Sequence, residues 1–152
     1  MKRFKHIKQN DHNDCGPTCL RIVAYWHGKN YDIDFLKKNC NINNDGVNLL
    51  DIVKAAELIG FKTLCVKIDT KKLDKVLEIG PCIIHWQKKH FVVLYKQKKS
   101  FWKRSKIYYI SDPARGRLTF NEEIFSKSWK GNSAKGYCLI LEPKEDFYNL
   151  KF

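Results

Sequence analysis

The sequence predicts one α+β domain spanning residues 1–152, with N-terminal helices packed on a mostly antiparallel β-sheet. Hydrophobic residues recur at helical spacing before residue 60, and they alternate at strand spacing in most of the chain that follows. A run of helices followed by a run of strands is typical of α+β domains. The hydrophobic fraction of 43% is enough for one packed core and argues against a disordered chain.

Three helices are predicted before residue 60, over residues 15–27, 33–40 and 48–59. Pro17 falls in the first turn of the first helix, where its missing N–H costs nothing, and Gly28 stands where that helix would end. Asp32 is expected to cap the second helix. The third helix ends at Gly60 and carries a predicted buried stripe of Leu49, Ile52, Val53, Ala56 and Ile59.

Strands dominate the second part of the chain. They are predicted over residues 62–68, 82–87, 90–97, 106–112 and 136–142. Two short helices are expected among them, one over 70–80 capped by Thr70 and one over 121–129. The dipeptide Gly-Pro at 80–81 and the stretch DPARG (112–116) indicate turns. The lysine-rich stretch KQKKSFWKRSK (96–106) is expected to form an exposed hairpin tip.

The formal net charge of +13 suggests nucleic acid, an anionic membrane surface or an acidic molecule as a binding partner. The lysines are spread along the chain, and the sequence holds no nucleic-acid-binding motif and no single basic helix. A solvated lysine-rich surface explains the charge at least as well, so nucleic acid is not expected as a partner. The longest apolar runs, CIIHW and HFVVLY, are too short to span a membrane, and the start MKRFKHIKQND lacks the apolar stretch of a secretory signal. We therefore expect a cytoplasmic chain.

The six cysteines are expected to be free thiols in a reducing compartment. They are Cys15, Cys19, Cys40, Cys65, Cys82 and Cys138. The missing secretory signal, the adequate core and the apolar surroundings of the last three argue against a disulfide framework. Because the sequence has no C-x-x-C or H-x-x-x-H pair, a metal site is not expected either. Most of the thiols should be buried, and one of them is a candidate for reactivity.

That candidate is Cys15, which lies at the predicted start of the first helix beside Gly16. Unpaired N–H groups and the positive end of the helix dipole meet at such a position, and they favour a thiolate over a thiol. Most cysteines are nevertheless structural, and Cys19, one turn further on, is interpreted as a packing residue. A nucleophilic role for Cys15 therefore depends on whether the chain supplies partners.

Three residues could be those partners. His90 opens one predicted strand and Asp112 closes the next, so a hairpin of these strands would make the two residues cross-strand neighbours. Asp before Pro is also a common start of a turn, and the pairing with His90 is what favours a functional interpretation. Gln9 lies six residues before Cys15, where its amide could donate to an oxyanion beside the Cys15 N–H. Nucleophile, base, orienting carboxylate and oxyanion donor are the components of a Cys/His/Asp mechanism.

With these positions in place, the chain resembles the papain-like peptidase domain at the N-terminus of bacterial peptidase-containing ABC transporters. These are the double-glycine leader peptidases of bacteriocin and peptide export. The matching stretches are QNDHNDCGPTC (9–19), DGVNLLDIVKAAELIGF (45–61), GPCIIHW (80–86), HFVVL (90–94) and ISDPARG (110–116). They cover nearly the whole chain, and the resemblance implies a papain-like cysteine peptidase fold.

The resemblance also implies roles and partners. Cys15 would be the nucleophile, His90 the general base and acid, Asp112 the residue that orients His90, and Gln9 the oxyanion donor. The substrate would be a precursor peptide whose amphipathic leader helix docks on an apolar surface and whose leader ends in Gly-Gly or Gly-Ala. The domain itself would need no cofactor, since ATP would bind a separate ATPase domain. The transporter's membrane and ATPase domains would be partners, which places the domain at the cytoplasmic side of the bacterial inner membrane.

Two departures from the family and two alternative functions accompany this interpretation. The family usually continues into transmembrane helices and an ATPase, whereas this chain stops at Phe152, so it is expected to be either an excised domain or a stand-alone version. Its tip at 96–106 is also long for the family. A longer tip could add contacts to lipid headgroups or to a transporter. The alternatives are a leader-binding module without turnover, which the presence of Cys15 disfavours, and a basic nucleic-acid-binding protein, whose binding would be salt-sensitive and independent of Cys15.

Overall fold

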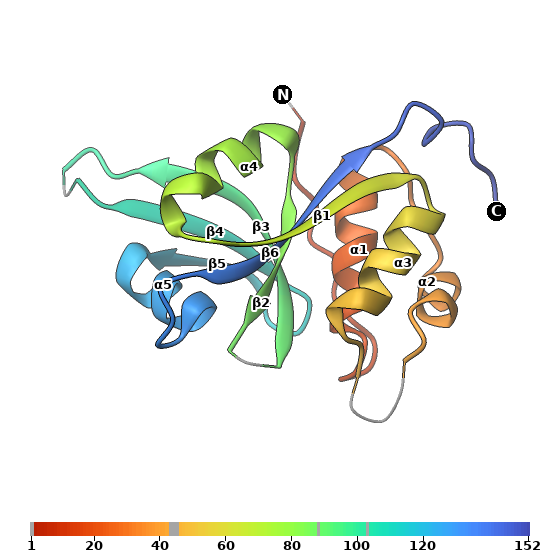
Figure 1. Ribbon diagram of the computed structural model, residues 1–152, viewed down its shortest axis with the longest axis horizontal. Helices are drawn as coiled ribbons and strands as arrows, with labels where there is room; N and C mark the ends of the chain where they lie inside the picture. Colours follow the sequence, from red (N-terminus) through yellow and green to blue (C-terminus); the bar gives the residue numbers. More distant parts are fainter. Residues whose placement is uncertain (1, 43–45, 88, 103) are drawn as a thin grey trace.

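One six-stranded β-sheet separates two groups of helices (Figure 1). The computed structural model describes residues 2–42, 46–87, 89–102 and 104–152. On one side lie the helices α1 (Cys15–Trp26), α2 (Ile33–Asn39) and α3 (Leu49–Leu58). On the other side lie α4 (Leu73–Ile79), which follows the 3₁₀ turn η1 (Thr70–Lys72), and α5 (Glu122–Lys130). The predicted α+β architecture is confirmed.

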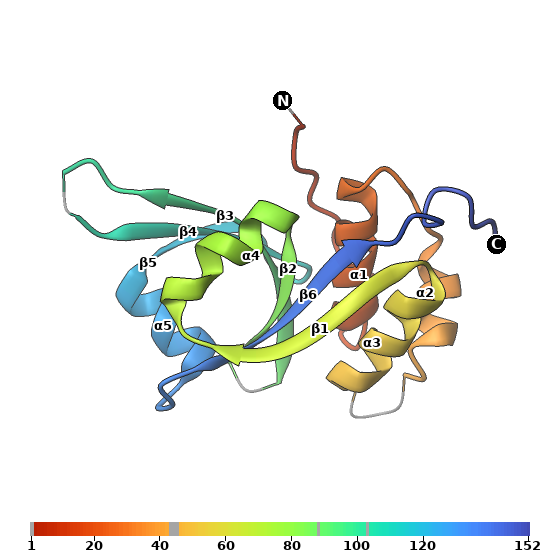
Figure 2. The ribbon, with the colours of Figure 1, turned by 45° about the horizontal axis from the view of Figure 1, so that its top comes forward.

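The sheet is antiparallel in every pair of neighbouring strands that the structure describes. Its strands are β1 (Phe61–Ile68), β2 (Cys82–Trp86), β3 (His90–Lys99), β4 (Lys106–Asp112), β5 (Gly116–Asn121) and β6 (Gly136–Pro143). Their order across the sheet is β1-β6-β2-β3-β4-β5. The last strand therefore lies between the first two, and it joins β1 to the hairpin-connected series that carries the rest of the sheet (Figure 2).

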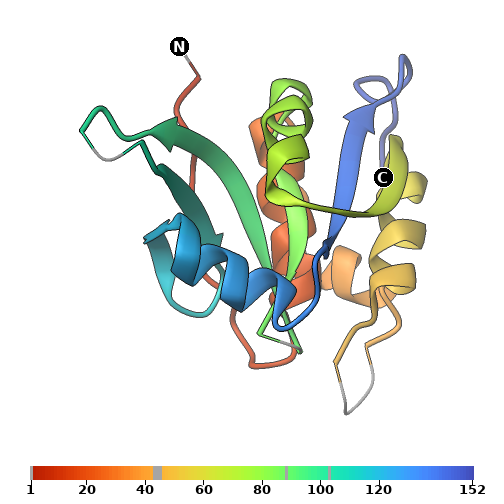
Figure 3. The ribbon, with the colours of Figure 1, turned by 60° about the vertical axis from the view of Figure 1, so that its left-hand side comes forward.

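The two faces of the sheet bury separate hydrophobic cores. Phe91 and Val93 of β3 pack with α1, α2 and α3. Val92 and Leu94 of the same strand pack on the opposite face with α4 and α5. This alternation is the one that the sequence HFVVL predicts. Each fully buried aliphatic side chain contributes about 1.5–3 kcal/mol. The core that contains Phe91 and Val93 holds α1 against β3, and the candidate site lies where this helix meets the start of that strand (Figure 3).

Most helix ends follow the local signals in the sequence. Asp32 accepts a hydrogen bond from the Asp34 N–H and caps α2, as predicted. The prediction that Thr70 caps the next helix is wrong. The Asp69 carboxylate accepts the Lys71 N–H instead, and the chain forms η1 before α4 begins. Within the buried stripe predicted for α3, Ile52, Ala56 and Ile59 are fully buried, whereas Leu49 and Val53 are only partly buried and border the core.

Two differences concern the strands. The strand β5 was not predicted from the sequence, yet all six of its residues pair with β4. The strand β3 continues two residues beyond the predicted end at residue 97, so the hairpin with β4 is longer than expected. Residue 103, within the predicted tip at 96–106, lies outside the described residues.

The six cysteines are free, as predicted, and five of them are buried. The exposed one is Cys65, on the edge strand β1.

Candidate active site

Cys15 is the first residue of α1, and its surroundings explain why the neighbouring residues are small. Its side chain is nearly buried, with a relative exposure of 9%. At Gly16, a Cβ atom would lie 3.0 Å from Cδ1 of Ile52 on α3, so glycine lets the start of α1 approach that helix. Pro17 occupies the first turn without losing a helical hydrogen bond. The sulfur therefore lies at a helix N-terminus that packing holds in place.

His90 and Asp112 meet at one end of the β3–β4 hairpin. The His90 Nε2 and the Asp112 Oδ1 are 2.7 Å apart. Their expected proximity is confirmed, although the register differs from direct pairing. Because Val93 pairs with Ser111, Asp112 lies opposite the residue before Val93, and His90 reaches it diagonally. The same Oδ1 atom accepts the Ala114 N–H at 2.9 Å, which fixes the carboxylate in the turn after β4.

The electrostatics of this pair favour a charged imidazolium. Burial by itself lowers the pKa of His90, but hydrogen bonds to Asp112 and to the Cys15 thiol outweigh burial and raise the pKa to about 9. Burial opposes ionisation of Asp112 as well, yet its bonds to His90 and to the Ala114 N–H lower its pKa below the usual value. An ionised carboxylate only accepts, so the His90 Nε2 carries the proton that it donates to Asp112. The other ring nitrogen, Nδ1, is then the one available to the thiol.

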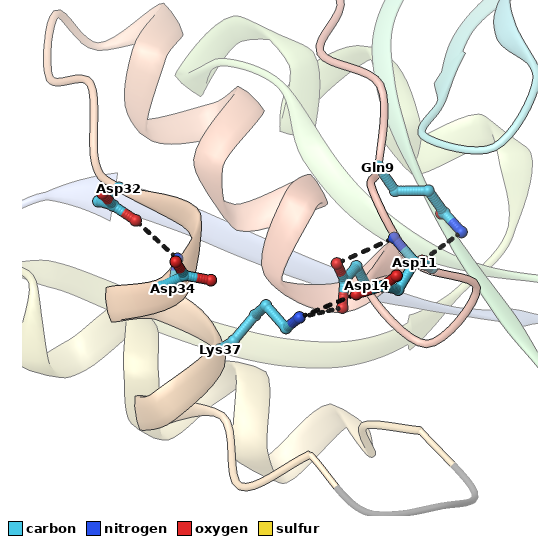
Figure 4. A network of polar contacts seen from close by, with 6 residues as sticks. All are labelled: Gln9, Asp11, Asp14, Asp32, Asp34 and Lys37. Carbon is cyan, nitrogen blue, oxygen red and sulfur yellow. Dashed lines mark hydrogen bonds and ion pairs between the residues drawn. The ribbon is translucent and has the colours of Figure 1, made fainter.

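Gln9 is anchored to the same region at both of its ends, and Figure 4 shows the side-chain contact. Its backbone N–H donates to the Pro113 carbonyl at 2.9 Å, one residue beyond Asp112. Its side-chain Nε2 donates to the Asp11 carbonyl at 2.9 Å, within the loop that leads to Cys15. A carboxamide has two N–H groups, so this bond leaves a second donor. The structure therefore brings Gln9, Cys15, His90 and Asp112 into one region, although they come from three separate parts of the chain.

Two supporting contacts were missed by the sequence analysis. The first is a buried carboxylate, Asp14, which is 1% exposed and directly precedes Cys15. Instead of capping α1, it lies 3.2 Å from the Lys37 Nζ of α2 and accepts the Asp11 N–H at 3.2 Å (Figure 4). A residue before a helix is usually a cap, so nothing in the sequence pointed to this ion pair.

The second missed contact joins α1 to β3. The Cys19 thiol, fully buried one turn after Cys15, donates to the Phe91 carbonyl at 3.3 Å. Burial raises the pKa of Cys19 well above its usual value, so the group stays a neutral donor. The interpretation of Cys19 as a packing residue is confirmed, and its bond also fixes the helix that carries Cys15 to the residue after His90.

A cavity of about 690 Å³ lies beside the Cys15–His90 pair. Its lining includes Phe91, next to His90, and Val47, whose Cβ lies close to Gly16. His85 and Tyr137 line it as well, and both also line a second cavity of about 590 Å³. The second cavity is basic, with Lys67, Lys127, Lys130 and Lys135 in its wall. The two cavities therefore share His85 and Tyr137 in their walls.

The described residues include no group of three or more His, Cys, Asp or Glu side chains that could hold a metal ion. In the same part of the chain, no helix has the length and apolar character needed to cross a bilayer.

Comparison with known proteins points to one family. The family model described as the peptidase C39 family matches residues 3–146. The chain is 33% identical over 131 residues to the colicin V secretion/processing ATP-binding protein of Escherichia coli, covering 86% of this chain and 18% of that protein. It is 32% identical over 148 residues to the lactococcin-G-processing and transport ATP-binding protein of Lactococcus lactis, covering 94% and 19%. The chain thus spans about a fifth of the length of these curated relatives.

Solved structures give the same result. The peptidase domain of Streptococcus ComA, a bi-functional ABC transporter, superposes with a TM-score of 0.79 at 30% identity, covering 93% of this chain and all of that one. A double-glycine motif protease from an AMS/PCAT transporter, solved in complex with the leader peptide, superposes with a TM-score of 0.75 at 30% identity, covering 94% of each chain.

Proposed function

The chain belongs to the peptidase C39 family and is a cysteine peptidase domain, and we propose that it cleaves precursor peptides after a Gly-Gly type site. The observation that carries the proposal is the arrangement of three groups. The His90 ring donates to a buried carboxylate at 2.7 Å, and the Cys15 thiol lies close enough to that ring to help raise its pKa. This combination supplies a nucleophile, a base and an orienting group in one place.

The proposed reaction proceeds in two steps. The Cys15 thiolate attacks the carbonyl carbon of the scissile peptide bond, and the carbonyl electrons move onto oxygen, where the Cys15 N–H and the Gln9 amide donate to them. The His90 imidazolium then gives its proton to the leaving amine as the C–N bond breaks, which leaves a thioester. In the second step, His90 takes a proton from water, the hydroxyl attacks the thioester, and Cys15 leaves as the thiolate. Asp112 orients His90 in both steps.

The proposed substrate is a leader peptide that ends in two small residues. One solved relative is a double-glycine motif protease bound to its leader peptide. In the present chain, Cys15 is 9% exposed, so a substrate backbone must approach closely to reach the sulfur, which favours glycine over larger residues. The apolar cavity and the lysine-lined cavity beside it suit an amphipathic leader that carries acidic residues.

The proposed partners are the remaining domains of a peptide exporter. The relatives are named as secretion, processing and transport proteins that bind ATP, and this chain matches about a fifth of their length. We therefore propose that the domain works with a membrane part and an ATPase part at the cytoplasmic side of the bacterial inner membrane. ATP would act on the ATPase part, and the peptidase chemistry itself would use no cofactor.

The test is cleavage of a synthetic peptide that joins an amphipathic leader to a core through Gly-Gly. Mass spectrometry should find one cut after the second glycine, and a peptide with Gly-Val at that site should remain intact. Thiol alkylation should abolish cleavage. Because Cys65 is the exposed thiol, the reaction is best followed in the Cys65→Ser variant, where loss of activity should track labelling of Cys15. Full activity after complete labelling of Cys15 would refute the thiol mechanism.

The same preparation tests the nucleic-acid alternative. Salt-sensitive binding to DNA or RNA, with no cleavage of any leader peptide, would favour that function over the peptidase.

A further inference from the structure

The tip of the β3–β4 hairpin presents a combination that the peptidase chemistry does not use. Phe101 and Trp102 are each 88% exposed, more than the other large hydrophobic residues that the structure describes. Their rings contact each other edge to face, with centroids 5.2 Å apart. The Ser100 N–H donates to the Ser105 carbonyl at 2.7 Å and closes the loop beneath them. The two aromatic side chains thus form a compact apolar end on a two-stranded ribbon that projects from the body (Figures 1 and 2).

The ribbon below this apolar end is cationic. Lys96, Lys98, Lys99 and Arg104 are exposed, and Lys106 is partly exposed. The sequence from His90 to Ser111 contains no acidic residue. The nearest charge partner within the described residues is Asp74 of α4, 3.6 Å from the Lys106 Nζ. The two exposed aromatic side chains are therefore surrounded by basic residues, with no acidic residue on the same ribbon.

We infer that this hairpin tip is a membrane anchor, in which Phe101 and Trp102 insert into the interface of an anionic bilayer while the surrounding cations bind its headgroups. Trp is favoured at the boundary between headgroups and acyl chains because its ring is apolar and its N–H is polar. Basic residues near an anionic leaflet each add to the attraction. The net charge of +13 adds a long-range component of the same sign.

The size of the tip decides between a bilayer and a protein partner. Two aromatic side chains bury about 150–250 Å² each. A stable protein interface needs about 800 Å² on each partner, so two side chains on a narrow ribbon fall well short. A bilayer accepts a small inserted wedge and supplies the counter-charge around it. The anionic bilayer is therefore the occupant that fits.

The position of the tip has a consequence for the active site. The strand β3 begins at His90 and runs to Lys99 beside the tip, while β4 returns to Asp112. Nine residue steps of about 3.3 Å separate the two ends, which gives about 30 Å. An inserted tip would therefore hold the His90–Asp112 pair about 30 Å from the membrane surface, where a peptide can enter. Since the two ends are so far apart, altering the tip should leave peptide cleavage unchanged.

The inference rests on the proposed membrane association of the domain. The experiment measures binding to vesicles in the absence of peptide, so its result does not depend on cleavage. The wild-type chain should cosediment with vesicles that contain phosphatidylglycerol and not with vesicles of phosphatidylcholine alone. The double variant Phe101→Ser, Trp102→Ser should bind the anionic vesicles at least about tenfold more weakly. Tyr148→Ser is the matched control, because Tyr148 is an exposed aromatic residue (59%) outside the hairpin, and its binding should equal that of the wild type.

A spectroscopic measurement separates insertion from surface attraction. Trp86 and Trp129 are buried, Trp26 is partly buried and Trp102 is exposed, so the double variant Trp26→Phe, Phe101→Ser keeps Trp102 as its reporter. Its fluorescence should shift to the blue and be quenched by lipids brominated on their acyl chains. Equal vesicle binding by the double variant and the wild type, or binding without quenching, would overturn the proposal. The proposal would also be overturned if the wild-type chain did not bind anionic vesicles but bound a purified transporter membrane part through the tip. That result would assign the tip to a protein partner. Normal peptide cleavage in all variants would show that the failure concerns the anchor alone.

Discussion

Replacing Asp112 by Asn should return His90 to a mostly neutral ring at neutral pH. Both hydrogen bonds of the carboxylate use one oxygen, Oδ1, which accepts from the His90 ring and from the Ala114 N–H. An asparagine can place its own carbonyl oxygen there and keep both bonds. The substitution therefore removes the negative charge while it retains most of the geometry.

The magnitude follows from the pKa of His90. The pKa is raised from 6.5 to about 9, and this difference corresponds to about 3 kcal/mol in favour of the imidazolium. Asp112 supplies more of this stabilisation than Cys15 does, and burial opposes both. Without the carboxylate, the pKa of His90 should fall to 6.5 or lower. At pH 7.5 the protonated fraction would then drop from nearly all to about one tenth or less, and the population of catalytically competent enzyme would fall about tenfold.

The Asp112→Asn substitution should also change how the free energy of unfolding depends on pH. Because the pKa of His90 is raised on folding, its contribution is fully present below pH 6.5 and is lost as the pH rises through 9. Asp112 has a lowered pKa, so its contribution is lost in acid, as the pH falls below 3.8. Between pH 6 and 9.5 the wild type should therefore lose about 3 kcal/mol more of its free energy of unfolding than the Asn variant.

The assay is an NMR titration of the His90 ring together with urea unfolding at both pH values. Asp74→Asn is the control, since that carboxylate pairs with Lys106 on the surface and should leave the His90 titration unchanged. If the pKa of His90 in the Asp112→Asn variant stayed near 9, the carboxylate would not be the main source of the shift, and the reasoning would fail.

The remaining predictions concern the nucleophile, the base and the packing of the sheet. Cys15→Ala should abolish cleavage of a Gly-Gly leader peptide, measured by mass spectrometry, while fluorescence anisotropy still detects binding; cleavage at the wild-type rate would refute the nucleophile. His90→Ala should lose more activity than Asp112→Asn, because orientation can be partly retained whereas the base has no substitute; equal losses would mean that Asp112 does more than orient. Gly136→Ala would place a Cβ atom 2.3 Å from Cε2 of Trp129, so it should cost about 1–3 kcal/mol in urea unfolding; an unchanged midpoint would contradict this packing argument.

The sequence predicted the parts of the fold that local signals determine. Gly28 and Gly60 both have positive φ angles just beyond a helix, a conformation that favours glycine, and they end α1 and α3 where expected. The proximity of His90 and Asp112 was also predictable, because a hairpin brings the start of one strand to the end of the next. Such features depend on neighbouring residues and on simple chain geometry.

Features that depend on distant residues were not predictable in the same way. The strand β5 follows a turn, and its stretch GRLTFN alternates but holds only two apolar residues, so its pairing with β4 is what identifies it as a strand. The ion pair of Asp14 with Lys37 requires α2 to pack against the start of α1, which no spacing in the sequence encodes. The choice of Asp69 over Thr70 as a cap is a shift of one residue between two good capping types.

The two halves of the candidate site come from different layers, so their alignment depends on how α1 rests on β3. Cys15 belongs to the helix layer, while His90 belongs to the sheet. The bond from Cys19 to the Phe91 carbonyl joins these layers one turn from the sulfur and one residue from the imidazole. Cys19 and Phe91 are fully or almost fully buried, so no water can replace the thiol as a donor to the carbonyl. A sliding movement of the helix would therefore leave the carbonyl without a hydrogen bond. A displacement of about 1 Å at such a pair can cost about a hundredfold in rate. The packing residue Cys19 therefore helps to set the Cys15–His90 distance, and the stability of this layer contact and the proposed activity are linked.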